Sequence, residues 1–341
     1  MITFDSKQLV KKFLSELPER SRDVLIQRYG LGDSIEKHTL ENIGQKYNIT
    51  RERVRQIENH SIKNIINSPV FEEAGVYFVE LQDLINSLGG VSAEQHLLEY
   101  LAKDPSTQND LYFLLTIGKP FYKEKGDNEF QTRWYIDKNL ETDVINALRK
   151  VHANFKEDLL IPEKDLLSLA LKEIQKQKRK IEVDEERVKR YLKLSRLIDK
   201  NPFDEWGLVS SNNIKIRGIR SHAYLVVRQN GSPMHFTEVA EGIQKHFGKK
   251  VHTATCHNEL IKDSRFVLVG RGLYALSEWG YSQGIVKDVI REILRKAGPM
   301  KKEAIVEQVL KERYVKENTV VVNLQNPNFF IKNSDGTYSL V

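Results

Sequence analysis

The sequence of 341 residues predicts a mainly α-helical protein, in which an N-terminal helix-turn-helix precedes tandem winged-helix modules. Three observations predict this fold class. Near the N-terminus, apolar residues recur at helical spacing and two short helices adjoin a tight turn. Farther along, residues 224–276 and 289–340 repeat one pattern of three helices and a closing hairpin. The chain has no long Gly/Ser-rich or Pro-rich stretch, so its modules are expected to adjoin one another.

The helix-turn-helix is predicted over residues 1–68. Apolar residues at helical spacing first indicate two helices, and Pro18 separates them. Thr39 then suits the N-cap of a short helix, and Thr50 suits the N-cap of a longer one. Between these helices, Asn48 tolerates the left-handed backbone of a tight turn.

The winged-helix modules are indicated by their hairpins. The segments FVLVGRGLYAL and FFIKNSDGTYSL each place apolar residues before a Gly-containing turn and a Tyr-x-Leu after it. Two weaker copies precede this pair, one with a hairpin tip at Gly126-Asp127 and one with a turn at Asn201-Pro202. The four predicted modules span residues 76–137, 140–210, 219–281 and 284–341.

The helix that begins after Thr50 has one continuous polar side at its N-terminal end. Arg51, Glu52, Arg55 and Gln56 fall within an arc of about 140° at 100° per residue. This end of the second helix enters the major groove in helix-turn-helix proteins. Arginine can bind guanine, glutamine can pair with adenine, and glutamate can accept from cytosine. The pattern therefore predicts a base-reading surface.

The alternative is a solvated, salt-bridged surface helix, which is the usual reading of a charge cluster. It leaves the N-cap, the tight turn and the preceding helix at matching distance unexplained. Arg53 lies at the edge of the polar side, where a phosphate contact is more natural than a base contact.

The segments LPERSRDVLIQRYGLGD (17–33) and HTLENIGQKYNITRERVRQIENHSIKNI (38–65) resemble region 4 of the bacterial sigma-70 family. The resemblance covers about residues 6–66 and implies recognition of the −35 promoter element and contact with the RNA polymerase flap. It implies base reading by Arg51, Glu52, Arg55 and Gln56. It implies positions at or near the phosphates for Thr39, Leu40, Glu41, Lys46 and Arg53. The family's strand-opening region 2 is expected to be absent, so promoter opening by the usual sigma mechanism is not expected.

A second resemblance covers residues 219–281. PMHFTEVAEGI (233–243) and GRGLYALSEWGY (270–281) resemble a HARE-type helix-turn-helix, the winged-helix module also found in the RNA polymerase delta subunit. Its predicted wing carries Arg265 and Arg271, which could contact the DNA backbone or a narrow minor groove. The alternative for this wing is a plain structural hairpin.

Two other charged segments have less specific readings. The wing of the last module has an acidic tip at 333–336, which favours a protein-contact or packing role. The basic run KEIQKQKRK (172–180) could touch phosphates, and a solvated helix end explains it equally well.

Composition narrows the remaining classes. A single cysteine, Cys256, excludes a disulfide framework and favours a reducing compartment. No segment approaches the roughly 20 apolar residues of a membrane span, and the N-terminus has no signal-peptide core. A net charge of +6 fits a nucleic-acid partner. We therefore expect a cytoplasmic, nucleoid-associated protein.

Catalytic and metal readings are weak. His252, Cys256 and His257 lie close in sequence, but a tetrahedral metal site needs four ligands and no second pair is nearby. Cys256 as a nucleophile would need a positioned base. The sequence has no phosphate-binding Gly-rich loop with its lysine. We expect a protein that is not an enzyme and uses no cofactor or metal.

The combined reading is a sequence-specific DNA-binding transcription factor that acts with bacterial RNA polymerase core at promoters. One alternative is a polymerase-bound, delta-like accessory protein with little sequence-specific DNA binding. A further alternative is an adaptor of a DNA-modification or restriction system. Target site, activator or repressor character and oligomeric state stay open.

Overall fold

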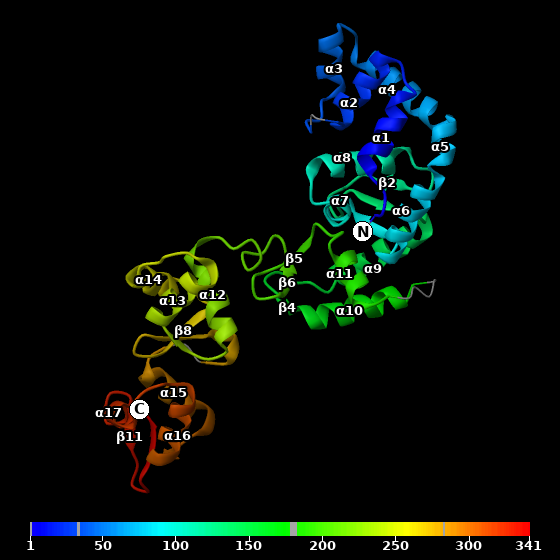
Figure 1. Cartoon of the computed structure of the whole chain (residues 1–341). Helices are drawn as coiled ribbons and strands as arrows, with labels where there is room; N and C mark the ends of the chain where they lie inside the picture. The colour runs from blue at the N-terminus through cyan, green and yellow to red at the C-terminus, as the bar shows by residue number, and fades with distance from the viewer. Residues whose placement is uncertain (1, 33–34, 178–182, 282–283) are drawn as a thin grey trace. The chain divides into compact units, whose positions relative to one another are not determined.

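The computed structural model describes residues 2–32, 35–177, 183–281 and 284–341 (Figure 1). The chain forms two compact units, residues 1–156 with 161–199 and residues 157–160 with 200–341. Helices dominate both units, and the sheets are small and three-stranded. The predicted fold class, a helix-turn-helix followed by winged-helix modules, is confirmed.

The N-terminal helix-turn-helix forms as the capping residues predict. Its helices are α1 (Ser6–Ser15), α2 (Glu19–Tyr29), α3 (Leu40–Tyr47) and α4 (Arg51–Ile66). The Thr39 hydroxyl accepts a hydrogen bond from the backbone of α3, and the Thr50 hydroxyl accepts one of 3.2 Å from the Arg53 amide. Asn48 ends α3 in the left-handed conformation, with φ of 52°.

The next module is a winged helix. Its elements are α5 (Pro69–Glu73), α6 (Gly75–Ser87), β1 (Val91–Ala93), α7 (Glu94–Leu101), α8 (Pro105–Ile117), β2 (Tyr122–Glu124) and β3 (Arg133–Tyr135). The strands form an antiparallel sheet with the order β1-β3-β2. The hairpin between β2 and β3 contains the predicted Gly126-Asp127 turn.

The helix-turn-helix and this winged helix share one hydrophobic core. Both α1 and α2 pack on α8, and a single buried cluster joins Phe13 of α1 to Phe78 and Trp134. The Asn109 amide of α8 donates to the carbonyl oxygen of Gly30 at 3.0 Å. Figure 1 shows α1 lying between the helix-turn-helix and α8. The N-terminal module is therefore held by side-chain packing as well as by the chain connection.

The third group of elements follows the same order of helices and strands. They are α9 (Lys138–His152), β4 (Ile161–Pro162), α10 (Glu163–Gln175), α11 (Glu185–Leu192), β5 (Ile198–Lys200) and β6 (Glu205–Leu208). The predicted turn at Asn201-Pro202 lies between β5 and β6. Part of the basic run 172–180, residues 178–180, lies outside the described residues.

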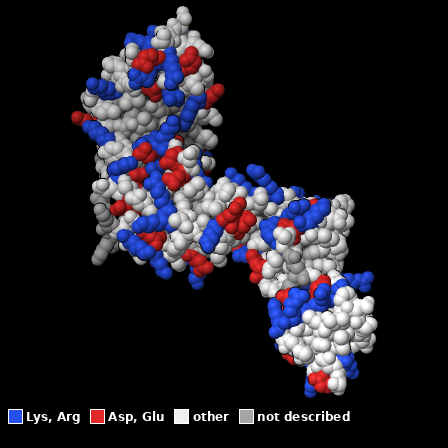
Figure 2. All heavy atoms as spheres, turned by 180° about the vertical axis from the view of Figure 1, so that it is seen from behind, with Lys and Arg blue, Asp and Glu red and all other residues white. Residues whose placement is uncertain are grey.

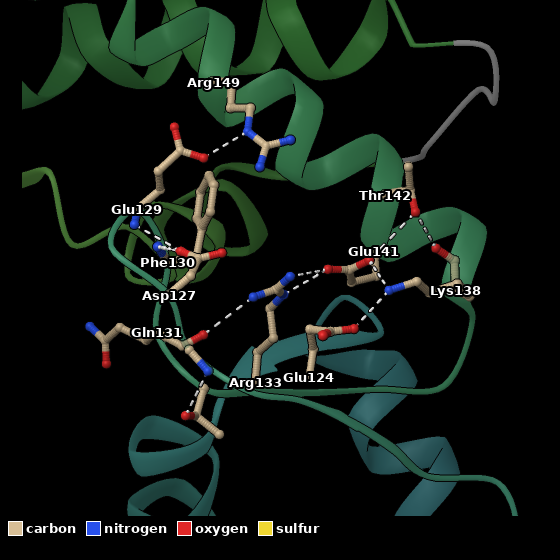
Figure 3. A network of polar contacts seen from close by, with 12 residues as sticks. Glu124, Asp127, Glu129, Phe130, Gln131, Arg133, Lys138, Glu141, Thr142 and Arg149 are labelled. Carbon is tan, nitrogen blue, oxygen red and sulfur yellow. Dashed lines mark hydrogen bonds and ion pairs between the residues drawn. The ribbon is translucent and has the colours of Figure 1, made fainter.

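A buried ion pair fixes α9 to the hairpin of the preceding module (Figure 3). The Arg133 guanidinium of β3 binds one carboxylate oxygen of Glu141 through two nitrogens, and both side chains are almost fully buried. Lys138 bridges Glu141 at 3.1 Å and Glu124 at 2.9 Å. Breaking such a buried pair strands a charge in the interior, so this junction resists separation.

The second unit contains two winged helices of the same plan. The first has α12 (Gly218–Asn230), β7 (Met234–His235), α13 (Phe236–Phe247), α14 (Thr253–Lys262), β8 (Phe266–Gly270), β9 (Leu273–Leu276) and the 3₁₀ helix η1 (Ser277–Trp279). The last has α15 (Val286–Ala297), β10 (Met300–Lys301), α16 (Lys302–Glu312), α17 (Glu317–Leu324), β11 (Phe330–Lys332) and β12 (Thr337–Leu340). Their sheet orders, β7-β9-β8 and β10-β12-β11, match, as expected of two copies of one plan. None of the described helices is both long and apolar enough to span a membrane.

Candidate nucleic-acid interface

A small apolar cluster sets the angle between α3 and α4. Val24 of α2, Ile43 of α3 and Val54 of α4 are fully buried against one another. Gly44 lets the turn that follows α3 approach closely, because a Cβ there would lie 2.7 Å from the carbonyl oxygen of Ile49. The outer side of α4 is therefore presented from a packed base.

The four predicted base-reading residues lie together on the exposed side of α4. Arg51, Glu52, Arg55 and Gln56 are all exposed, while Val54 between them points inward. The sequence-based placement of these residues on one surface agrees with the structure. Their role in base reading stays a prediction.

These side chains pair with their neighbours on α4. The Arg55 guanidinium forms two hydrogen bonds to the Glu52 carboxylate, at 2.9 and 2.7 Å. Hydrogen bonding by Arg55 lowers the pKa of the Glu52 carboxyl. Arg53 donates to the side-chain oxygen of Gln56 at 3.1 Å. Exposed pairs of this kind are weak, so contact with base edges can replace them at little cost.

The predicted phosphate-contacting residues are spread over two helices. Thr39, Leu40 and Glu41 lie at the start of α3, where Leu40 is half-buried against the small cluster and can offer DNA only part of its surface. Lys46 lies at the other end of α3, 3.7 Å from the Asp23 carboxylate. Arg53 is exposed on α4.

Two groups of residues that the sequence reading missed support α4. The Glu58 carboxylate on its inner side accepts a hydrogen bond of 3.0 Å from the Tyr29 hydroxyl and lies 3.5 Å from Nε of Arg28. Burial, together with the Glu58 charge, raises the pKa of Tyr29. A carboxylate on the apolar side of an amphipathic helix is the signal that could have indicated this anchor.

Beside α4, Arg20, Arg53 and His60 line a hollow of about 260 Å³. Arg20 comes from α2 and also lies over the Tyr47 ring, 5.6 Å from its centroid. These side chains extend the positive surface past α4. Figure 2 shows Lys and Arg interspersed with Asp and Glu over the helix-turn-helix.

The wing of the 219–281 module offers less cationic surface than the sequence suggests. Arg265 lies before β8, at the base of the wing, and its guanidinium is held 2.7 Å from Asp263 and 4.5 Å from the Tyr224 ring centroid. Arg271 is exposed at the tip. The Tyr314 amide of the last module donates to a wing carbonyl at 2.8 Å, so part of this wing is covered.

The residues weighed for metal binding have structural environments. Cys256 is fully buried, and burial raises the pKa of its thiol to about 11. The His257 ring packs on Phe236 with centroids 4.5 Å apart. Within the described parts of the chain, no three His, Cys, Asp or Glu side chains meet as a possible metal site.

Comparison with known proteins identifies two segments. Residues 13–65 match the family described as "Sigma-70, region 4", and residues 219–279 match HARE-HTH, a family described as a "restriction endonuclease HTH domain". Among curated proteins, RNA polymerase sigma factor RpoD of Helicobacter pylori is 46% identical over 61 residues, which are 18% of this chain and 9% of that protein. Sigma factor SigA1 of Synechococcus elongatus is 56% identical over 52 residues, 15% of this chain and 13% of that protein.

A longer match is to sigma factor RpoS of Coxiella burnetii, which is 38% identical over 79 residues, 23% of this chain and 22% of that protein. The chain thus spans less than a quarter of the length of these curated relatives. It joins a sigma-70 region 4 helix-turn-helix to a HARE-type helix-turn-helix, as its sequence motifs predict.

Proposed function

We propose that this protein is a sequence-specific DNA-binding transcription factor that acts with bacterial RNA polymerase at promoters. The observation that carries the proposal is the exposed set Arg51, Glu52, Arg55 and Gln56 on a region-4-like helix with a packed base. In the proposed complex, the N-terminal end of α4 lies in the major groove and these side chains contact base edges. The protein is proposed to be a cytoplasmic, nucleoid-associated protein without catalytic activity.

The roles within the interface follow from chemistry and placement. Arg51 and Arg55 are suited to guanine, Gln56 to adenine and Glu52 to cytosine. Arg53 and Lys46 are suited to phosphates, whose contacts set the position of the protein on the duplex. The Glu58 anchor keeps the helix orientation fixed while the outer side chains exchange partners.

The contact with polymerase is proposed to use the exposed surface of the helix-turn-helix and to involve the flap of the beta subunit. The apolar sides of α1 and α2 already pack on α8. A polymerase segment would therefore bind beside this core and leave its packing intact.

The test is a selection of binding sites from random DNA, followed by affinity measurements on the selected site. The double variant Arg51→Ala, Gln56→Ala should lose about 1–3 kcal/mol per removed base contact and relax the sequence preference. Asn64→Ala, an exposed change farther along α4, serves as the matched control and should keep both properties. Unchanged affinity and preference in the double variant would show that α4 does not read bases.

A second candidate is a polymerase-bound accessory protein with little sequence-specific DNA binding. The covered wing of the 219–281 module and the Asp335-containing tip of the last module favour it for the second unit. This candidate predicts co-purification with polymerase after nuclease treatment and a shallow dependence of DNA affinity on salt. A steep fall of affinity with salt would favour the transcription factor instead.

A further inference from the structure

A cavity of about 350 Å³ lies in the N-terminal unit, on the side of α1 where it meets α2 and α8. Its volume is within the range of small-ligand pockets. Apolar side chains from α1 and α2 form much of its wall. The lining residues that carry the argument are Val10, Leu14, Ile26, Lys11, Arg22 and Asp110.

The carboxylate of Asp110 is the unusual group in this cavity. Asp110 comes from α8, and only 1% of its surface is exposed. Neither of its carboxylate oxygens has a hydrogen-bond partner among the residues that the structure describes. A buried polar group without a partner costs free energy, so native proteins seldom keep one unless it serves a function.

The charges around Asp110 favour a cation. The nearby Asp5 and Asp104 carboxylates act in the same direction as burial and raise the pKa of Asp110, whereas Lys7 lowers it. Three carboxylates thus share this end of the cavity with one lysine. An ammonium group that enters here would find both hydrogen-bond acceptors and a negative field.

The other end of the cavity is positive. Arg22 of α2 donates through Nε to the Leu14 carbonyl at 3.0 Å and through Nη2 to the Leu17 carbonyl at 3.1 Å. A guanidinium has five N–H donors, so these two bonds leave donors for a further acceptor. Lys11, exposed on α1, adds a second cation to the lining.

The distance between the two ends follows from the length of α1. The end near Asp110 lies by Lys7, and the Arg22 end lies by Leu14, seven residues farther along the helix. At 1.5 Å per residue these positions are about 10 Å apart. Three extended residues span about the same length.

We propose that this cavity binds a short zwitterionic peptide with an apolar central side chain. Its N-terminal ammonium donates to the Asp110 carboxylate. Its C-terminal carboxylate accepts from Arg22 and Lys11. Its central side chain lies against Val10 and Leu14. Water alone would fill the volume, but it would gain little from the apolar wall.

The test uses the full chain and the tripeptide Ala-Leu-Ala in three forms: free, N-acetylated and C-amidated. Isothermal titration should show saturable binding of the free peptide. Acetylation removes the ammonium, and it should weaken binding about tenfold or more, because a charge-assisted hydrogen bond to a buried carboxylate is lost. Amidation should weaken binding through the Arg22 end.

Two variants separate the ends of the cavity. Asp110→Asn should weaken binding of the free peptide and should abolish the difference between free and acetylated peptide. Lys11→Gln should reduce the difference between free and amidated peptide, while Lys12→Gln, its exposed neighbour on α1, should leave every affinity unchanged. Absence of saturable binding at millimolar peptide, or equal affinities of free and acetylated peptide for the unmodified chain, would overturn the proposal.

Discussion

Single side chains on the inner side of α4 determine how firmly its outer side is held. Glu58 receives the Tyr29 hydroxyl and the Arg28 guanidinium, and only 9% of its surface is exposed. Nothing in the charge pattern of the outer side indicates this contact. It depends on where α2 lies, which the local spacing of residues cannot specify.

We expect Glu58→Ala to lower the free energy of unfolding by about 1–3 kcal/mol, because the buried Tyr29 hydroxyl and Arg28 lose their acceptor. Urea denaturation measures this loss. Glu58→Gln retains a side-chain oxygen and should recover part of the stability. If Glu58→Ala unfolds at the same urea concentration as the unmodified protein, Glu58 does not anchor α4.

Asp110 should make the stability of the N-terminal unit depend on pH. Burial raises its pKa to about 6 in the folded protein, above the usual 3.8. The folded state therefore binds the proton more tightly than the unfolded state. The stabilisation is fully present below about pH 3.8 and is lost as pH rises through 6.

The corresponding variant is Asp110→Asn, which carries no charge at any of these pH values. At pH 7.5 we expect it to be more stable than the unmodified protein by up to about 3 kcal/mol, the equivalent of the pKa shift. Near pH 4 the two proteins should melt at similar temperatures. Equal melting temperatures at pH 7.5 would contradict a raised pKa. Asp5, Lys7 and Asp104 stay in place in both proteins, so their contributions cancel.

At the level of the element, the helix-turn-helix is the part of the fold that the sequence predicts best. Its caps, Thr39 and Thr50, and its left-handed Asn48 act on neighbouring residues, and the structure contains all three as expected. The wing was harder to predict. Arg265 lies within the predicted hairpin, but the structure places its guanidinium against Asp263 and Tyr224, contacts that depend on the packed module.

Gly44 gives a prediction for the turn between α3 and α4. An added Cβ would lie 2.7 Å from the Ile49 carbonyl oxygen, so Gly44→Ala should force the two helices apart. We expect a loss of about 1–3 kcal/mol in thermal denaturation, together with weaker DNA binding. Gly75→Ala is the matched control, because an added methyl group there would meet no atom within 4 Å, and it should leave stability unchanged or slightly higher.

At the level of the whole molecule, the sequence predicts the order of modules but misses how the first two are joined. The periodicity of α1 and α8 predicts that each has an apolar side, yet it cannot tell that these sides face each other. The same limit applies to the candidate site. The exposed residues of α4 follow from local spacing, whereas Glu58, Arg20 and Asp110 gain their importance from contacts between distant segments.

The shared core predicts how fragments behave. Residues 1–68 alone would expose the sides of α1 and α2 that α8 covers, so we expect this fragment to unfold without a cooperative transition. Residues 1–199 keep the core and the Arg133–Glu141 pair, and they should unfold cooperatively. Circular dichroism during heating distinguishes the two. A cooperative transition in fragment 1–68 would show that the helix-turn-helix is stable on its own.

The packing of α1 against α8 also bears on how this protein could have changed during evolution. Promoter-reading helix-turn-helix segments are often regarded as interchangeable parts. Here an exchange would have to bring partners for Phe78 and Trp134 as well as a new base-reading helix, because both rings belong to the core that α1 completes. Changes in DNA preference should therefore arise by substitution on the outer side of α4, with α1 and α8 diverging only as a matched pair.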